Sequence, residues 1–165
     1  AGTAGYIYTF AGNGTAGYLA DGVLATSALL YAPAGVFMDA QGNLYIADGT
    51  NNRVRFVPKT GGSYFAQTMA ANCIYTIAGN GTAGYLADNV AATSTRVNAP
   101  GNVHVDSEGN VCFADYSNHR VRFVPKANGT YFGQSMTANY IYTIEGKGTA
   151  GYLGDNAAPT STRIY

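Results

Sequence analysis

Three copies of one stretch decide the fold of this chain: YIYTFAGNGTAGY at residues 6–18, CIYTIAGNGTAGY at residues 73–85 and YIYTIEGKGTAGY at residues 140–152. Their isoleucines, Ile7, Ile74 and Ile141, are spaced by 67 residues. The segments between the copies keep the same step, since RVRFVPK occurs at residues 53–59 and again at 120–126. The 165 residues therefore hold about two and a half copies of one structural unit.

Each unit contains four short stretches that are typical of β-strands. In the first unit they cover residues 33–39, 44–47, 53–57 and 74–77, with the turn sequence QGN at 41–43. In the third stretch, Val54 and Phe56 alternate with Arg53 and Arg55, which places the two pairs on opposite faces. Four strands joined by tight turns predict an antiparallel meander. We expect its core to contain Val36, Met38, Leu44, Ile46, Val54 and Phe56.

One such sheet does not bury both of its faces, so copies have to pack face to face. Radial packing of four-stranded sheets is the β-propeller. The sequence therefore predicts an all-β fold of propeller blades, with one blade at residues 33–79 and a second at 100–146. We expect residues 80–99 to link the blades and residues 147–165 to form a terminal loop. Residues 1–32 are expected to supply an outer strand and a linking loop.

A sequence pattern shared by the two blades points to a known family. It reads Pro-x-x-Val-x-x-Asp-x-x-Gly-Asn-x-x-x-Ala-Asp-x-x-Asn-x-Arg-Val and occurs at residues 33–54 and 100–121. This pattern resembles the NHL repeat, the blade of NHL-type propellers, and the AGNGTAGY link resembles the extended form in bacterial arrays. The resemblance implies an ion pair within each blade, between Asp48 and Arg53 and between Asp115 and Arg120. An Arg–carboxylate fork is geometrically favourable at such a turn.

Two blades fall short of the four to eight that a closed propeller needs. Either the chain is a piece of a longer array of blades, or it assembles with itself into a closed ring or an extended assembly. We expect self-assembly, with a trimer of six blades as the favoured ring. The surplus outer strand at residues 6–11 is expected to pair with a neighbour, since exchange of an identical element is a low-cost route to oligomers. The residues of this assembly strand are Tyr6, Ile7, Tyr8, Thr9 and Phe10.

Composition excludes several classes of partner. Nine basic and nine acidic side chains give a net charge of zero, and charged residues are only 11% of the chain. No basic excess exists to attract nucleic acid or an anionic membrane surface, and no apolar run is long enough for a spanning helix. Few lysines and many asparagines and tyrosines favour a secreted, extracellular protein.

The linking loops carry repeated side chains that suit a binding rim. An aromatic ring beside Asp and Asn oxygens predicts a sugar-binding or calcium-binding site, one for each blade. The opposing interpretation is that Gly-Asn-Gly only forms the turn while Tyr packs on the blade edge. The candidate ligand-binding residues are Tyr18, Asp21, Tyr85, Asp88, Tyr152, Asp155, Asn13 and Asn80.

Catalytic signals are weak, and we expect a non-enzymatic scaffold without a metal or cofactor. Gly12 to Gly17 matches the dinucleotide motif G-x-G-x-x-G, but its copies lie between β-meanders rather than in a βαβ unit. His104 and His119 are not repeated, and neither has metal-ligand spacing. Cys73 and Cys112 each stand where another copy has Tyr, so free thiols are expected. A lectin-like propeller is the alternative function, and a fragment of an NHL-like lyase or lactonase ranks last.

Overall fold

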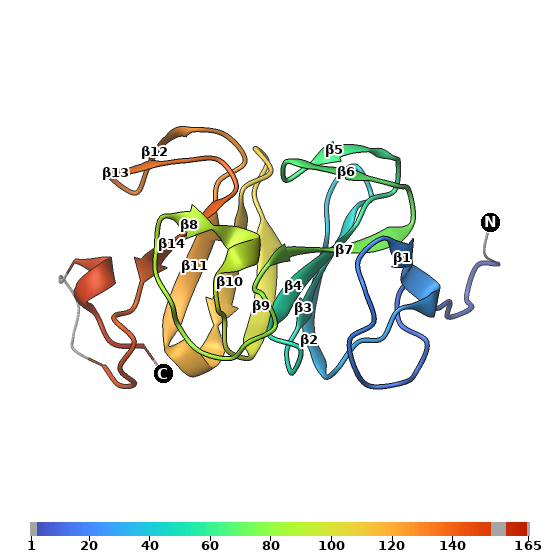
Figure 1. Cartoon of the computed structure of the whole chain (residues 1–165), viewed down its shortest axis with the longest axis horizontal. Helices are drawn as coiled ribbons and strands as arrows, with labels where there is room; N and C mark the ends of the chain where they lie inside the picture. Colours follow the sequence, from blue (N-terminus) through green and yellow to red (C-terminus); the bar gives the residue numbers. More distant parts are fainter. Residues whose placement is uncertain (1–2, 153–157, 165) are drawn as a thin grey trace.

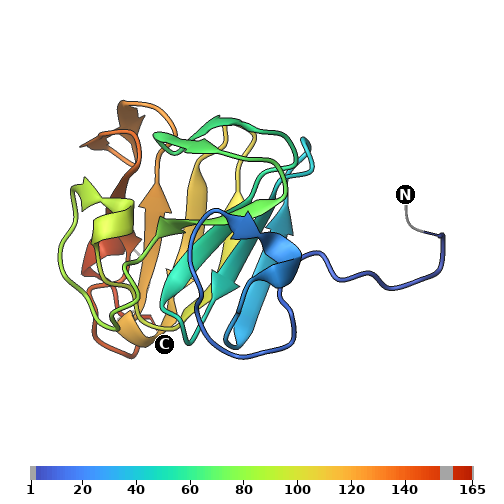
Figure 2. The same ribbon diagram turned by 45° about the vertical axis from the view of Figure 1, so that its right-hand side comes forward.

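The structure is a computed structural model that describes residues 3–152 and 158–164. Two antiparallel sheets stand side by side as blades, with a hairpin at the same end of each (Figure 1, Figure 2). The described residues contain strands and short 3-10 turns but no α-helix. The predicted all-β architecture of propeller blades is confirmed. No helical turn in the described part of the chain is long and apolar enough to cross a membrane.

The two blades have the same strand order. Blade 1 runs β1-β7-β4-β3-β2 and blade 2 runs β8-β14-β11-β10-β9. The strands of blade 1 are β1 (Val23–Leu24), β2 (Pro33–Met38), β3 (Leu44–Asp48), β4 (Arg53–Val57) and β7 (Cys73–Ala78). Those of blade 2 are β8 (Val90–Ala91), β9 (Pro100–Val105), β10 (Val111–Asp115), β11 (Arg120–Val124) and β14 (Tyr140–Glu145). The short strands β1 and β8 lie in stretches predicted as loops, so each linking loop adds a fifth strand to the sheet that follows it.

A hairpin interrupts each blade between its third and fourth long strands. Residues 60–72, which lie between the third and fourth predicted strands, form β5 (Gly62–Tyr64) and β6 (Gln67–Met69), and blade 2 has β12 (Gly129–Tyr131) and β13 (Gln134–Met136). The two residues at the first hairpin's tip, Phe65 and Ala66, have φ of 50° and 58°. Positive φ at both positions is what a two-residue hairpin turn requires.

The first aspartate of the repeated motif, Asp39 in blade 1 and Asp106 in blade 2, forms the first turn of each blade. Asp39 Oδ1 accepts hydrogen bonds from the backbone N–H groups of Gln41 (3.0 Å) and Asn43 (2.8 Å). Gly42 in the same turn has φ of +84°, a conformation that glycine adopts without strain. Asp106 forms the same pair of bonds in blade 2. The repeated acids after β2 and β9 are therefore turn-forming residues.

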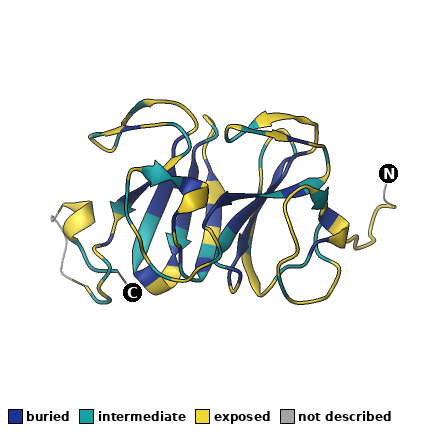
Figure 3. Ribbon diagram, viewed as in Figure 1, coloured by how far each residue is buried: buried dark blue, intermediate teal, exposed yellow. Residues whose placement is uncertain are grey.

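The main core lies between the blades. Side chains from one face of blade 1, such as Tyr45 and Phe56, pack against Val111 and Phe113 of blade 2. The first strands, β2 and β9, lie next to each other across this junction. Burial is concentrated in the central strands of both sheets (Figure 3). Two smaller clusters cover the opposite face of each blade, one around Ile46 and one around Phe123.

The core prediction is right for four residues and wrong for two. Leu44, Ile46, Val54 and Phe56 are buried, whereas Val36 is 63% exposed and Met38 is 52% exposed. Both exposed residues belong to β2, on the face that points away from blade 2. Blade 2 covers only the other face of blade 1. The burial that the sequence pattern predicts for Val36 and Met38 would therefore require a further blade on this side.

The predicted outer strand at residues 6–11 does not form in the single chain. Residues 6–10 have no strand structure and run away from the blades (Figure 2). Ile7 is fully exposed, and Tyr6 is 71% exposed. The copy of this segment in blade 1 is β7, which pairs with β4. In blade 1 the edge of β4 is occupied by β7, so residues 6–10 pair with no strand among the described residues.

Candidate binding sites

The three linking loops share one backbone contact near their start. The N–H of Gly12 donates to the Ala25 carbonyl (2.8 Å), that of Gly79 to Ala92 (2.9 Å), and that of Gly146 to Pro159 (3.1 Å). Each of the three acceptors begins a 3-10 turn, namely η1 (Ala25–Ser27), η2 (Ala92–Ser94) and η4 (Pro159–Ser161). The glycine-rich string is therefore a loop between sheets, and its repeated residues come to equivalent places in space.

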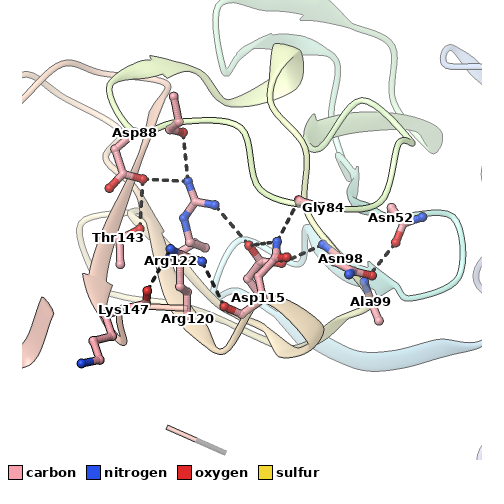
Figure 4. A network of polar contacts seen from close by, with 12 residues as sticks. Asn52, Gly84, Asp88, Asn98, Ala99, Asp115, Arg120, Arg122, Thr143 and Lys147 are labelled. Atoms are coloured by element: carbon pink, nitrogen blue, oxygen red, sulfur yellow. Dashed lines mark hydrogen bonds and ion pairs between the residues drawn. The ribbon is translucent and has the colours of Figure 1, made fainter. Parts of the chain in front are cut away.

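A buried arginine joins each linking loop to its blade. Arg122 lies between two carboxylates, with Nη1 3.1 Å from Asp115 Oδ2 and Nη2 2.9 Å from Asp88 Oδ1 (Figure 4). Its side chain is fully buried, as is that of Asp115. Arg55 stands between Asp48 (3.5 Å) and Asp21 (3.0 Å) in the same manner. Each arginine thus joins an acid of the linking loop to an acid of the sheet. Separating the loop from the sheet would leave a buried charge uncompensated, so these triads hold the loop in place.

The predicted ion pairs of Asp48 with Arg53 and of Asp115 with Arg120 are wrong. Arg53 faces Asp48 across the ladder, but it donates instead to the carbonyls of Asn51 (3.0 Å) and Asn80 (2.9 Å). Arg120 binds the Asn118 and Lys147 carbonyls, each at 3.1 Å.

The loops on either side of blade 1 explain why Arg55, and not Arg53, pairs with the buried acid. The loop after the blade offers the Asn80 carbonyl to Arg53. Arg55, two residues further along the same face, reaches Asp48 and also Asp21 in the loop before the blade. Sequence reasoning missed the role of Arg55 and Arg122. The available signal was that two acids, Asp21 and Asp48, recur with the 67-residue step and call for a shared cation.

Burial changes the titration of the innermost acids. Desolvation raises the pKa of Asp48 and of Asp115 above that of an ordinary aspartate. Hydrogen bonds oppose this shift: Asp48 accepts from the Tyr31 N–H (2.8 Å) and from Asn51 Nδ2 (2.8 Å), in addition to Arg55. The carboxyl group is thus buried and bonded inside the protein, so it is not presented to a ligand.

The predicted rim residues are engaged in the same network. The guanidinium of Arg53 lies 3.8 Å from the ring centre of Tyr18, and Arg120 lies 3.8 Å from that of Tyr85. One face of each ring is therefore covered by a cation. Asp21 accepts bonds from Arg55 and from both the N–H and the hydroxyl of Thr76, each at 3.0 Å.

The asparagines of the rim serve the loop turns. Asn13 Oδ1 accepts from the Thr15 N–H and Asn80 Oδ1 from the Thr82 N–H, both at 2.9 Å. Of the third copy, Tyr152 is 75% exposed, and Asp155 lies outside the described residues. The described parts of the chain hold no cluster of three His, Cys, Asp or Glu side chains that would suit a metal ion.

Two equivalent pockets nevertheless gather the repeated residues. One, of about 250 Å³, is lined by Tyr18, Asp21, Arg53, Gln67, Thr76 and Asn80, among others. The other, of about 660 Å³, is lined by the residues 67 positions later: Tyr85, Asp88, Arg120, Gln134, Thr143 and Lys147. The structure therefore brings Tyr and Asp of each loop together beside the end of the following blade.

The unrepeated histidines and cysteines are dispersed. His104 packs on the Phe37 ring, with centroids 4.8 Å apart. His119 ends the turn η3 (Tyr116–Asn118) with φ of 51°. Cys73 and Cys112 are free thiols, and burial raises the pKa of Cys112.

Comparison with known proteins supports the fold alone. No protein-family model and no curated protein matches the sequence. Among solved structures, an auxiliary nutrient binding protein from Bacteroides thetaiotaomicron aligns at 19% identity and a TM-score of 0.47, over 71% of this chain and 27% of that one. A structural genomics protein of unknown function from the same organism aligns at 18% identity and a TM-score of 0.50, over 74% and 25%. The chain thus spans about a quarter of these proteins, and it shares with the second an all-β, propeller-like fold.

Proposed function

We propose that this chain is a non-enzymatic propeller building block of NHL type that assembles with copies of itself through the free faces of its two blades. The observation that carries the proposal is a difference in exposure between equivalent residues. Val103 and Val105 in β9 are each 4% exposed, whereas their counterparts Val36 and Met38 in β2 are 63% and 52% exposed. Blade 1 covers the first pair, and none of the residues that the structure describes covers the second.

Blade 2 at the opposite end of the molecule also has apolar residues that are exposed although their counterparts in blade 1 are buried or partly buried. Phe65 is partly buried at the junction between the blades, while its counterpart Phe132 is 65% exposed. Tyr45 is buried at the same junction, and its counterpart Cys112 is only half-buried. The free face of blade 2 is thus equivalent to the face of blade 1 that packs against blade 2. The free face of blade 1 is equivalent to the face of blade 2 that packs against blade 1.

This arrangement predicts a head-to-tail contact in which blade 2 of one copy packs on blade 1 of the next. Such a contact joins two different surfaces, so it closes into a ring when the rotation per copy fits, and otherwise continues as a filament. A ring of three copies would hold six blades, which lies within the range of closed propellers. We propose the trimer as the assembled form.

The terminal segments are copies of each other and compete at that contact. Residues 6–30 repeat residues 140–164. In a head-to-tail junction, residues 6–30 of one copy and residues 140–164 of its neighbour would therefore require the same position. The loop before blade 1 is held by Asp21 on Arg55 and by Asn51 Nδ2 on the Gly17 carbonyl (2.6 Å). We expect this loop to keep its position and residues 146–164 of the neighbouring copy to leave theirs. The exposed segment 6–10 repeats residues 140–144 of β14, so we propose that it pairs with β11 of the neighbour only where β14 leaves that position.

Native mass spectrometry and light scattering of the full chain test the proposal. We expect a discrete trimer, and we expect Val36→Glu to give monomers because it puts a charge into the contact. Leu24→Glu is the matched control, since Leu24 is 58% exposed on β1 and lies outside the proposed contact. A wild-type chain that stays monomeric at every concentration contradicts the proposal, as does equal dissociation by both substitutions.

Carbohydrate binding is the second candidate function, and the recurrence of one pocket in both blades favours it. Each pocket offers the edge of a Tyr ring together with Asp, Gln and Thr polar groups, which suit the hydroxyls of a sugar. Glycan-array binding should be lost in the double variant Tyr18→Ala, Tyr85→Ala. It should persist in Tyr116→Ala, which removes an exposed ring that lines neither pocket. Binding that survives the double substitution would count against this function.

A further inference from the structure

A third pocket lies within the chain, lined by hairpin β5–β6 and by the turns that follow β2 and β9. Figure 1 shows where the hairpin lies. Its volume of about 480 Å³ is in the range of small-molecule sites. One wall is aromatic and comes from blade 1, with Tyr45, Tyr64 and Phe65. The turns after β2 and β9 bring the carboxylates of Asp39, Asp106 and Glu108 to the same pocket. The pocket thus combines ring surfaces with negative charge.

The carboxylates of this pocket have no counter-ion. The ion pairs found within residues 3–152 and 158–164 all belong to Arg55 and Arg122. Lys126 also lines the pocket, but it is not within 4.0 Å of a carboxylate oxygen there. Three acids against one lysine leave a net negative charge beside apolar surface, where charges interact more strongly than in water.

Two of the acids converge and keep free acceptor positions. Asn110 Nδ2 donates to Asp106 Oδ2 (2.8 Å) and to Glu108 Oε2 (3.4 Å), so both carboxylates lie around one amide nitrogen. Asp39, in contrast, accepts four bonds, including one from the Tyr45 hydroxyl (3.3 Å). A carboxylate has about four acceptor sites. Asp106 accepts three bonds, two of them on Oδ1 from the N–H groups of its turn, and Glu108 accepts one. Glu108 therefore keeps most of its acceptor sites for a donor in the pocket, and Asp106 keeps about one.

The aromatic wall is held in place at an energetic cost. Phe65 packs edge-on against Phe56, with ring centroids 5.3 Å apart, and against Tyr45 at 6.4 Å. The hairpin turn that positions it places Ala66 at φ of 58°. The same turn in blade 2 has Gly133 there, the residue that adopts this conformation freely. Strained backbone of this kind is concentrated at ligand clamps and other functional sites.

The buried side of the pocket is apolar and negative as well. Burial, followed by the neighbouring Asp39 carboxylate, raises the pKa of the Tyr45 phenol. Burial lowers the polarity around this phenol, and the Asp39 carboxylate makes the local potential negative. The negative potential favours a cation over an anion, and the low polarity suits a ligand with an apolar body.

We infer that this pocket binds an organic cation, an ammonium group carried on a flat or apolar body. The ammonium would donate to Asp106 and Glu108, and the body would lie against Phe65 and Tyr64. Cations are also attracted to the faces of aromatic rings, and desolvation strengthens that attraction. The site lies within one chain, so it does not depend on the proposed assembly.

Calorimetric titration with phenethylammonium tests the inference, with 2-phenylethanol as its uncharged analogue. We expect dissociation constants on the order of 1 mM for the cation, a ligand of few atoms, and about tenfold weaker binding of the alcohol. Glu108→Gln should weaken the cation by a similar factor. This variant introduces the residue that blade 1 carries at the equivalent position, Gln41, so the turn should be preserved.

Glu145→Gln is the matched control, since it removes the same charge from an exposed residue that does not line the pocket. It should leave the affinity unchanged, whereas Phe65→Leu, which keeps apolar bulk but removes the ring, should reduce it several-fold. Equal affinity for the cation and the alcohol would overturn the inference. So would no detectable heat with the cation, equal effects of the two glutamate variants, or unchanged binding by Phe65→Leu.

Discussion

The equivalent valines Val36 and Val103 allow the proposed contact to be measured against an internal standard. Both occupy the same position of the first strand in their blades, yet Val36 is 63% exposed and Val103 is 4% exposed. Replacing each by alanine removes the same atoms. Any difference in stability between the two variants then reports how far each site is covered.

The magnitude follows from burial. Val103→Ala removes two methylene equivalents at about 0.8 kcal/mol each, and the cavity that remains brings the loss to about 2 kcal/mol. Val36→Ala should change the unfolding free energy of the single chain by less than about 0.5 kcal/mol, as surface substitutions do. In a head-to-tail assembly the next copy covers Val36, and the same substitution should then cost about 2 kcal/mol per contact. That is about a 30-fold weaker association constant.

Urea unfolding followed by circular dichroism at low protein concentration gives the first pair of values. Sedimentation across a range of concentrations gives the association constants of the wild type and of Val36→Ala. Two results would refute the reasoning. One is equal destabilisation of the isolated chain by both substitutions, and the other is an association constant that Val36→Ala leaves unchanged.

Three further predictions concern the network and the turns. Arg122→Met should lower the unfolding free energy by about 3–5 kcal/mol, because Asp115 and Asp88 lose their partner, while Arg120→Met, at a half-buried position, should cost clearly less in the same urea titration. Ala66→Gly should raise the thermal midpoint, with up to about 1 kcal/mol of relieved strain, and Gly133→Ala should lower it; opposite signs would contradict the assignment of strain to this turn. The raised pKa of Asp115 means that the native state takes up a proton before the unfolded state does, so its contribution to stability is present below the unfolded pKa and is lost as the pH rises through the native one. The free energy of unfolding, measured from pH 7 down to about pH 4, should therefore contain a contribution from Asp115 that grows as the pH falls. Asp115→Asn should remove this contribution, and a pH profile unchanged by that substitution would refute the linkage.

The sequence by itself determined the repeat, the strands and the blade architecture. A constant step of 67 residues, alternating apolar positions and turn residues at fixed places all act locally, and local rules suffice to predict a meander. The same reasoning placed Tyr18 with Asp21 and Tyr85 with Asp88, and the structure puts each pair in one pocket.

Only the tertiary structure decided which charges meet and which apolar faces are covered. Arg53 and Arg55 share one face of β4. The loop after the blade gives Arg53 the Asn80 carbonyl, 27 residues away, and the loop before it brings Asp21, 34 residues away, to Arg55 beside Asp48. The pocket at the junction joins the turn after β2 with the turn after β9, one repeat apart, so no local pattern reveals it. Equal valines in equal strands differ in exposure because burial depends on what packs against a strand, and that neighbour is a matter of the fold rather than of the residue.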